Sequence, residues 1–321
     1  MSLIVNESFL ESARYERSDR AQQELVGRLN GIGSEPKEPR VLDESLGDTA
    51  KGSHGERYLG GTEPLLSLRG IDKNFGPVQA LTGVDLDIPL GQVTALVGDN
   101  GAGKSVLVKT ISGIWEPDGG QIFWEGKPVH IRSPKEAAEM GITTVYQDLA
   151  LCDNLDIVQN MFLGREPTRH RILDETTMEL AAKRTLAELS VVTVRSIRQP
   201  VASLSGGQRQ AVAVGKAVMW NSKLVIFDEP TAALAVSSAA MVLELIRGLA
   251  SRGLAVIVIS HVLNEIFSVA DRIAVLHLGH IAAVGPVGEF DPQKVANLMA
   301  TGGSSWSSRD LSSSSTGEQE L

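Results

Sequence analysis

The chain has 321 residues, of which 42% are hydrophobic, a single cysteine and a formal net charge of -9 at pH 7. That length can bury one large core or two modest ones, and no apolar stretch approaches the roughly 18 residues of a membrane-spanning helix. The acidic balance argues against broad nucleic-acid binding, and the lone Cys152 excludes an internal disulfide or a thiolate metal cluster. The N-terminus shows no secretory pattern, so we expect an intracellular protein.

The two ends of the chain differ in composition from its middle. Residues 1–63 are dense in charged side chains with scattered Gly, Ser and Pro, and residues 303–321 are rich in serine. Such segments bury too little apolar surface to offset the entropy lost on ordering, so we expect both to be disordered, although 18–29 could form a short amphipathic helix. The folded part is therefore predicted to span residues 64–302.

The first part of this span predicts strands and helices in alternation. Alternating side chains over 84–88 indicate a half-exposed strand, and the apolar run 93–97 indicates a buried strand that ends at a glycine-rich loop. A helix is expected over 105–111. A second helix, leading to a strand over 142–145, is marked by an N-cap serine, a first-turn proline, a capping glutamate and a terminal glycine: Ser133, Pro134, Glu136 and Gly141.

Residues 148–203 change to helical periodicity, with no clear strand among them. Asp174 can cap a helix whose apolar residues fall on one face, namely Met178, Ala182, Leu186 and Leu189, and we interpret this stretch as a helical insert. Asp291 can cap a last short helix. Strand patterns return after the insert, separated by helix-length segments, at 224–227, 254–259 and 273–276. Strands that alternate with helices predict an α/β fold with a largely parallel sheet.

A glycine-rich loop joins the buried strand 93–97 to the helix after it. Its residues fit the pattern G-x-x-x-x-G-K-[ST] of a P-loop: Gly98, Asp99, Asn100, Gly101, Ala102, Gly103, Lys104 and Ser105. The backbone N–H groups of such a loop surround phosphate oxygens, and the helix N-terminus adds the positive end of its dipole. In that role Lys104 reaches the β and γ phosphates of ATP, and Ser105 ligates Mg²⁺.

Two carboxylates, Asp228 and Glu229, follow the apolar strand 224–227. The carboxyl end of a strand is where an open α/β sheet binds its ligand. We expect Asp228 to hold Mg²⁺ through water and Glu229 to polarise the attacking water as a general base. Paired acids in isolation would more often cap a helix or face solvent, but the phosphate loop upstream favours the catalytic interpretation.

The segment Leu204-Ser205-Gly206-Gly207-Gln208 resembles the signature of the ABC ATPases, a family of P-loop NTPases. In that family the signature begins a helix and faces the γ-phosphate of ATP bound by the other subunit of a head-to-tail pair. The resemblance therefore implies a homodimer in which Ser205, Gly206, Gly207 and Gln208 contact the partner's nucleotide. Ser205 and Gln208 also fit a capping box at a helix start, and both roles can hold at once.

Three further residues match family motifs in chain order. Gln147 follows the strand 142–145 and matches the glutamine that touches Mg²⁺ and the nucleophilic water, where the sheet meets the insert. His261 matches the switch histidine, whose imidazole can hydrogen-bond the γ-phosphate. Phe75 occupies the place of the aromatic residue that stacks on adenine, although its own pattern fits a core residue equally well.

The resemblance covers residues 65–302 and implies a P-loop NTPase core with an N-terminal antiparallel β part and a helical insert. The chain departs from the general pattern at Ala235. Most ABC ATPases carry an aspartate there that crosses to the partner's phosphate loop, and the sugar-importer branch resembles this chain in lacking it. The same branch, the ribose, xylose and fructose uptake ATPases, looks like this chain at 145–151, 160–166, 229–234 and 270–273. That branch usually joins two ATPase units in one polypeptide. This chain carries one unit, so it resembles the shorter fructose-type form.

The resemblance implies an ATP-hydrolysing, Mg²⁺-dependent subunit that energises import of a monosaccharide through a separate membrane permease, at the cytoplasmic face of the plasma membrane. An extracytoplasmic sugar-binding protein would be an indirect partner, nucleic acid would not be one, and the coupling surface is expected near 146–165. Three alternatives remain: a soluble ABC ATPase acting on ribosomes or DNA, an ABC transporter ATPase for another cargo, and a P-loop kinase. The kinase would leave the signature unexplained.

Overall fold

The computed structural model describes residues 63–189, 196–232 and 234–303. The extensions expected to be disordered, and the helix suggested over 18–29, lie outside these ranges apart from Glu63 and Gly303. Within the described ranges, no helix is both long and apolar enough to cross a bilayer.

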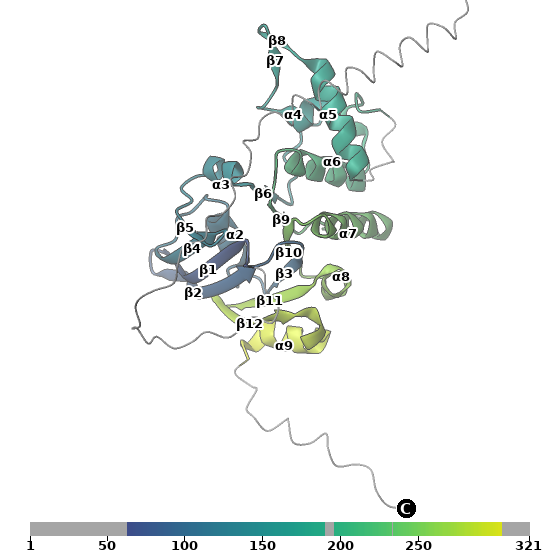
Figure 1. Ribbon diagram of the computed structural model, residues 1–321. Helices are drawn as coiled ribbons and strands as arrows, with labels where there is room; N and C mark the ends of the chain where they lie inside the picture. Colours follow the sequence, from purple (N-terminus) through teal and green to yellow (C-terminus); the bar gives the residue numbers. More distant parts are fainter. Residues whose placement is uncertain (1–62, 190–195, 233, 304–321) are drawn as a thin grey trace, which may run out of the picture. The chain divides into compact units, whose positions relative to one another are not determined.

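Six strands form the main sheet, in the order β12-β11-β3-β10-β9-β6 (Figure 1). They are β3 (Val93–Val97), β6 (Ile142–Val145), β9 (Leu224–Asp228), β10 (Ala255–Ile259), β11 (Arg272–His277) and β12 (His280–Pro286). All pair in parallel except β12, which runs antiparallel to β11 at one edge. The predicted α/β fold with a largely parallel sheet is confirmed. The sequence gives no sign of β12, because most of its residues are partly exposed and it ends in Gly285 and Pro286.

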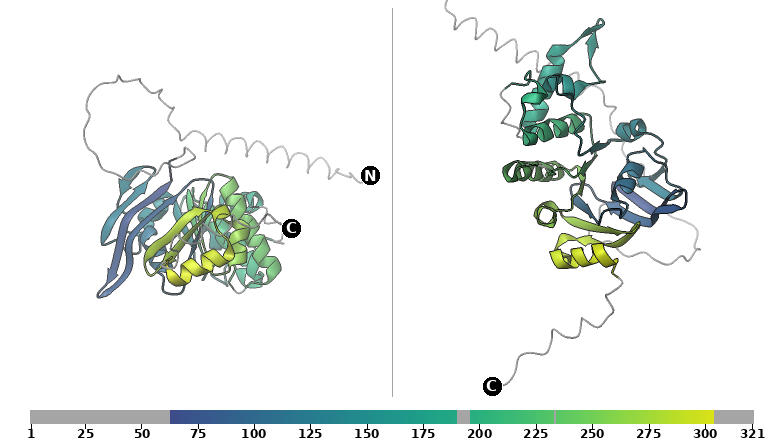
Figure 2. Two further views of the ribbon diagram at one scale, coloured as in Figure 1. Left: turned by 90° about the horizontal axis from the view of Figure 1, so that it is seen from below. Right: turned by 180° about the vertical axis from the view of Figure 1, so that it is seen from behind.

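A second sheet is antiparallel and has the order β2-β1-β4-β5. Its strands are β1 (Leu66–Phe75), β2 (Val78–Ile88), β4 (Gly119–Trp124) and β5 (Lys127–Val129). In Figure 2 its purple and blue strands stand to one side of the main sheet. The helix α2 (Lys104–Ile111) packs its buried side chains into one apolar cluster with residues of both sheets. The expected N-terminal antiparallel part is therefore present, with β2 beginning ahead of the alternation at 84–88.

Helices cover the other face of the main sheet: α6 (Gly206–Val218), α7 (Val236–Ser251), α8 (Leu263–Val269) and α9 (Pro292–Thr301). With apolar clusters on both faces, every residue of β3 and β10 is buried. Parallel strands covered on both sides need continuous apolar residues, which explains why runs rather than alternation mark them in the sequence. Asp291 caps α9 as expected, because its Oδ1 accepts the Lys294 N–H at 2.8 Å.

The insert contains α4 (Ile157–Phe162), α5 (Glu175–Glu188) and a hairpin of β7 (Thr168–Arg169) and β8 (Ile172–Leu173). The expectation that no strand interrupts this stretch is wrong at the hairpin, whose strands are too short to show a period. Asp174 caps α5, with its Oδ1 accepting the Thr177 N–H at 3.1 Å. The insert has its own apolar core, which also takes in Leu204 and Val212, so its packing extends beyond residue 203 into α6.

Two polar side chains hold the insert together. Asn160 is fully buried, and its Nδ2 donates to three carbonyl groups of the preceding loop while its Oδ1 accepts the Cys152 N–H at 2.7 Å. Arg198 donates to the carboxylates of Asp156, Glu175 and Glu179 at distances between 2.7 and 3.2 Å. These contacts tie the loop before α4 and the first turns of α4 and α5 into one unit.

Helix starts differ in how well they are capped. At α3 (Pro134–Met140), Ser133 Oγ accepts the Glu136 N–H at 3.2 Å and Gly141 ends the helix with φ 92°, as the sequence predicts. By contrast, α7 has 16 residues and begins after Ala235 with no side-chain cap. The first N–H groups of α7 therefore lack a side-chain acceptor at the cap position.

Ala235→Asp should stabilise the fold, because an N-cap aspartate accepts a first-turn N–H and interacts favourably with the helix dipole. A gain of about 1 kcal/mol would raise Tm by about 2–4 °C in a domain of this size, as thermal unfolding can measure. Ser237→Asp adds the same charge within the first turn without supplying the cap, and it should gain less. Equal gains from the two variants would contradict capping as the cause.

Candidate nucleotide site

The phosphate loop lies between β3 and α2, and close backbone contacts fix its shape. A Cβ on Gly98 would lie 2.3 Å from the carbonyl oxygen of Leu276, and one on Gly103 would lie 2.7 Å from that of Ala80. Gly103 also has φ 106°, a region that glycine enters without strain. Only glycine therefore fits at these two positions, and the loop is held between β2 and the end of β11.

Lys104 folds back over the loop that precedes it. Its Nζ donates to the Gly98 carbonyl at 2.7 Å and to the Asp99 carbonyl at 3.0 Å. Burial lowers the pKa of Lys104, while the negative charges of Glu229, Asp99 and Asp228 act in the opposite direction. A partly desolvated ammonium group placed over a phosphate loop can exchange these carbonyl partners for phosphate oxygens, which are stronger acceptors.

Asp228 ends β9 at the carboxyl edge of the main sheet, and Glu229 follows it. Burial raises the pKa of Asp228, the charge of Glu229 raises it further, and Lys104 acts against both. Glu229 has φ 52°, which costs a non-glycine residue energy, and its N–H donates to the Ile259 carbonyl at 3.0 Å. That bond fixes the turn after β9 to the end of β10.

His261 contacts Glu229 across the ends of neighbouring strands. Its Nδ1 lies 3.0 Å from one carboxylate oxygen and 2.9 Å from the other. An ionised carboxylate can only accept, so Nδ1 carries the hydrogen in this pair. The imidazole is mostly exposed whereas the carboxylate is largely covered, so the histidine ring is open to a ligand while it orients the glutamate.

These side chains line one open cavity of about 720 Å³. The predicted site residues that line it are Asn100, Gly101, Gly103, Lys104, Ser105, Gln147, Asp228, Glu229 and His261. The remaining loop residues, Gly98, Asp99 and Ala102, do not line it. The structure therefore brings together the phosphate loop, the two carboxylates, the glutamine and the histidine, which come from segments far apart in the sequence.

The donor set of this cavity fits Mg²⁺ bound together with phosphate. Over residues 63–189, 196–232 and 234–303, no three His, Cys, Asp or Glu side chains group as a metal site. As metal ligands the cavity offers the Asp228 carboxylate, the Ser105 hydroxyl and the Gln147 amide, while the Glu229 carboxylate lies beside them. Mg²⁺ typically takes one or two such protein oxygens and completes its shell with phosphate oxygens and water.

The signature residues lie at the start of α6 and do not line this cavity. Ser205 Oγ accepts the Gln208 N–H at 3.3 Å, and Gln208 Oε1 accepts the Ser205 N–H at 3.0 Å, which confirms the predicted capping box. A Cβ on Gly206 would lie 2.8 Å from Leu234 Cδ2, and one on Gly207 would lie 2.9 Å from a side chain of α7. Both glycines thus have a packing reason as well.

Phe75 does not line the cavity either. Its ring packs edge-on against Trp115 with the centroids 4.7 Å apart, and Lys73 Nζ lies 5.6 Å from the ring centre. Two further segments line the cavity but carry no sequence motif, so the sequence does not predict them: the start of β2 and the turn between β11 and β12. Their lining residues are Val78, Gln79, Ala80, Leu278 and Gly279.

The sequence matches the ABC transporter family over residues 81–232. It is 50% identical over 224 residues to the fructose import ATP-binding protein FrcA of Rhizobium meliloti. The aligned region covers 68% of this chain and 86% of that relative. The chain belongs to the ABC transporter family. This ABC ATPase is also 46% identical over 237 residues to the xylose/arabinose import ATP-binding protein XylG of Sulfolobus acidocaldarius, covering 74% of the chain and 94% of the relative.

Longer relatives and solved structures agree with this assignment. The ribose import ATP-binding protein RbsA 1 of Rubrobacter xylanophilus is 42% identical, but the chain covers only 43% of its length. A nucleotide-free ATP-binding cassette from an ABC transporter superposes with a TM-score of 0.64 at 27% identity, covering 72% of this chain and 97% of that one. The fold and the family establish the protein as an ATP-binding and ATP-hydrolysing member of the ABC ATPases.

Asp228→Asn should stabilise the ligand-free ABC ATPase at neutral pH while impairing turnover. In the folded state the pKa of Asp228 lies above its value in the unfolded chain. At every pH above that raised pKa, the ionised carboxylate therefore lowers the stability of the fold. Asparagine carries no charge and removes this cost. The gain should appear as a higher Tm of the variant at neutral pH. The gain should shrink at about pH 4 and below, where the wild-type carboxyl becomes neutral in both states. Thermal unfolding across pH tests this, and a wild type more stable than the variant at neutral pH would contradict it.

Proposed function

We propose that this ABC ATPase binds Mg²⁺ and ATP in the cavity of about 720 Å³ and hydrolyses ATP there to drive a membrane permease. The observation that carries the proposal is the convergence of Lys104, the Asp228–Glu229 pair and His261 at the carboxyl edge of the parallel strands of the main sheet. This edge is where open α/β sheets bind ligands. Each group there has the charge or hydrogen-bonding capacity that phosphoryl transfer to water requires.

The residues divide into those that hold the nucleotide and those that act on water. The loop N–H groups and Lys104 would hold the β and γ phosphates, and Ser105, Gln147 and Asp228 would hold Mg²⁺, which neutralises phosphate charge when bound. Glu229 would take a proton from the attacking water while the water oxygen bonds to the γ-phosphorus. The bond between the γ-phosphorus and the oxygen that leaves with ADP would break in the same step. His261 would keep the glutamate oriented, and a protonated ring could also donate Nε2–H to a γ-phosphate oxygen.

A second copy of the chain is proposed to complete each site. Residues 205–208 begin a helix of 13 residues, whose N-terminus favours an anion, yet they lie outside the cavity of their own chain. Two copies arranged head to tail would place each signature against the γ-phosphate held by the other. ATP would then join the copies, and hydrolysis would let them separate.

Glu229→Gln should stop turnover and leave ATP binding intact, because the amide keeps the side-chain shape but cannot accept the proton. Loss of a general base typically costs about 10²–10⁴-fold in rate. With Mg²⁺ and ATP the variant should accumulate as a dimer on size-exclusion chromatography, whereas Lys104→Ala should lose ATP binding and remain monomeric. Full hydrolysis by Glu229→Gln would refute the general-base role. A dimer that forms equally well without nucleotide would refute the nucleotide-joined pair.

A monosaccharide is the proposed cargo class. The supporting relatives, at 50% and 46% identity, are fructose and xylose/arabinose import ATP-binding proteins. The permease, fed by an extracytoplasmic sugar-binding protein, would select the sugar, and this chain would bind that permease at the cytoplasmic face of the plasma membrane. Nucleic acid is not among the proposed partners, because a net charge of -9 disfavours contact with phosphate backbones.

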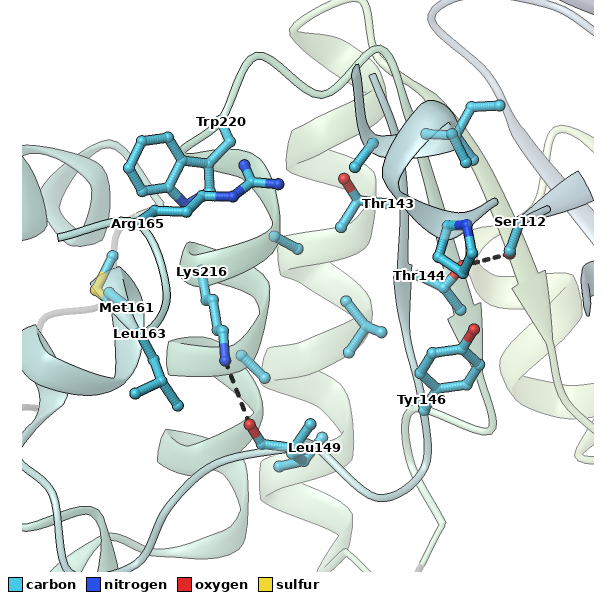
Figure 3. Close-up of a pocket in the computed structure, with 18 of the residues that line it drawn as sticks. Ser112, Thr143, Thr144, Tyr146, Leu149, Met161, Leu163, Arg165, Lys216 and Trp220 are labelled. Carbon is cyan, nitrogen blue, oxygen red and sulfur yellow. Dashed lines mark hydrogen bonds between the residues drawn. The ribbon is translucent and has the colours of Figure 1, made fainter. Parts of the chain in front are cut away.

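The permease is proposed to dock in a groove of about 300 Å³ between the β6 edge of the main sheet and the insert (Figure 3). Figure 3 shows Tyr146 and Thr144 on one side and Met161, Leu163 and Arg165 on the other. The groove mixes apolar side chains with charged ones, the cationic Arg165 and Lys216 and the acidic Asp148, which suits a short amphipathic segment of a partner. Because the next residue after Tyr146 is a lining residue of the nucleotide cavity, the same loop touches both places.

Leu163→Glu should uncouple transport from ATP hydrolysis, because it places a charge on the insert side of the groove. The isolated chain should keep its ATPase rate, while permease co-purification and sugar uptake should fall at least about tenfold. Leu180→Glu is the matched control, because Leu180 is 45% exposed against 43% for Leu163 but lies on α5 away from the groove. Equal losses in both variants would contradict docking at this surface.

A further inference from the structure

We propose that Leu278, in the turn between β11 and β12, contacts the nucleoside part of the bound nucleotide. This role rests on the proposed ATP site and adds to it a residue that belongs to none of the motifs. Leu278 lines the same cavity as the phosphate loop, Glu229 and His261. Three features single it out: its backbone strain, the way its turn is fixed, and the chemistry of the wall that it forms.

Leu278 occupies a backbone position that does not suit its side chain. Its φ is 44° and that of Gly279 is 83°, and His277 pairs with His280 across them, as in a two-residue hairpin turn of type I′. Such turns strongly favour Asn or Asp before Gly, and a bulky apolar residue there is an outlier. The side chain is 70% exposed, so burial in its own chain offers little compensation. Strained backbone of this kind clusters at active sites and ligand clamps.

Hydrogen bonds fix this turn to the phosphate loop. The Gly279 N–H donates to the Ala102 carbonyl at 2.9 Å, and the Gly279 carbonyl accepts the Thr82 N–H at 2.9 Å. A Cβ on Gly279 would lie 2.9 Å from the Ala80 carbonyl oxygen, so the turn cannot shift toward β2. The position of Leu278 relative to the loop is therefore set by the fold and does not depend on a ligand.

The cavity wall around Leu278 differs from the part that would hold phosphates. The charged groups come from the phosphate loop and the strand ends, whereas β2 and the β11–β12 turn contribute no charged side chain. Besides Gln79, Ala80 and Gly279, they contribute the exposed apolar side chains of Val78, which is 61% exposed, and Leu278. Phosphates held by Lys104 and the loop leave the uncharged base and ribose to pack against this apolar wall. Leu278 and Val78 therefore offer a nucleoside an apolar surface inside the cavity, at a place where no charged side chain lines it.

Leu278→Asn in the full chain tests this role, because asparagine suits the left-handed backbone but removes the apolar contact. The Tm of the ligand-free variant should rise while the Kd for Mg²⁺·ADP rises about fivefold. The Kd for Mg²⁺·pyrophosphate, which has no nucleoside, should stay unchanged, and calorimetry measures both constants. Leu278→Met keeps an apolar contact and should bind ADP like the wild type. Leu90→Asn, at another exposed leucine outside the cavity, is the matched control and should change neither Kd.

Two results would overturn the role of Leu278. One is an ADP Kd in Leu278→Asn equal to that of the wild type. The other is a parallel loss of pyrophosphate affinity, which would mean that the turn acts through the phosphate loop and not on the nucleoside. A wild-type chain that binds neither ADP nor pyrophosphate would instead overturn the proposed function itself, so the two failures are distinguishable.

Discussion

The close approach of backbone to backbone at the phosphate loop is the constraint on which the rest of the site depends. Gly98 lies against the carbonyl of Leu276 and Gly103 against that of Ala80, with no space for a side chain at either. These neighbours belong to β11 and β2, so both sheets fix the loop between β3 and α2. A loop held in this way presents its N–H groups with little further loss of entropy on binding. The site is thus a property of the two-sheet frame as a whole.

The charged side chains around that loop are placed to interact with a ligand and do not fully stabilise one another. Burial lowers the pKa of Lys104 and raises that of Asp228, so the attraction between these groups only partly offsets the loss of solvent around each. A nucleotide phosphate and a divalent cation would add further opposite charge next to Lys104 and Asp228 respectively. The ligand-free protein therefore gives up stability at the place where it needs preformed electrostatics, a trade found commonly at active sites.

Sequence patterns predict what is local and miss what depends on pairing between distant segments. The helix caps at Ser133 and Asp174 were predictable because a few neighbouring residues form them, and the buried strands because both faces need apolar side chains. The strand β12 and the β7–β8 hairpin bury few side chains and leave no period to detect. Leu278 reaches the cavity only through hairpin and sheet pairing, and the orientation of Phe75 depends on its packing with Trp115.

The helix α6 links the two surfaces through which this ABC ATPase is proposed to act. Its first turn carries the signature, fixed by the Ser205–Gln208 box. Ala213 and Lys216 further along the helix line the groove, and Figure 3 shows Lys216 there. A phosphate of the second copy that seats at the start of α6 would therefore move one wall of the groove as a rigid body. The opposite wall contains Tyr146, and the next residue, Gln147, lines the nucleotide cavity of the same chain. A permease segment in the groove would then sense two nucleotides at once, and only the closed pair would position both walls.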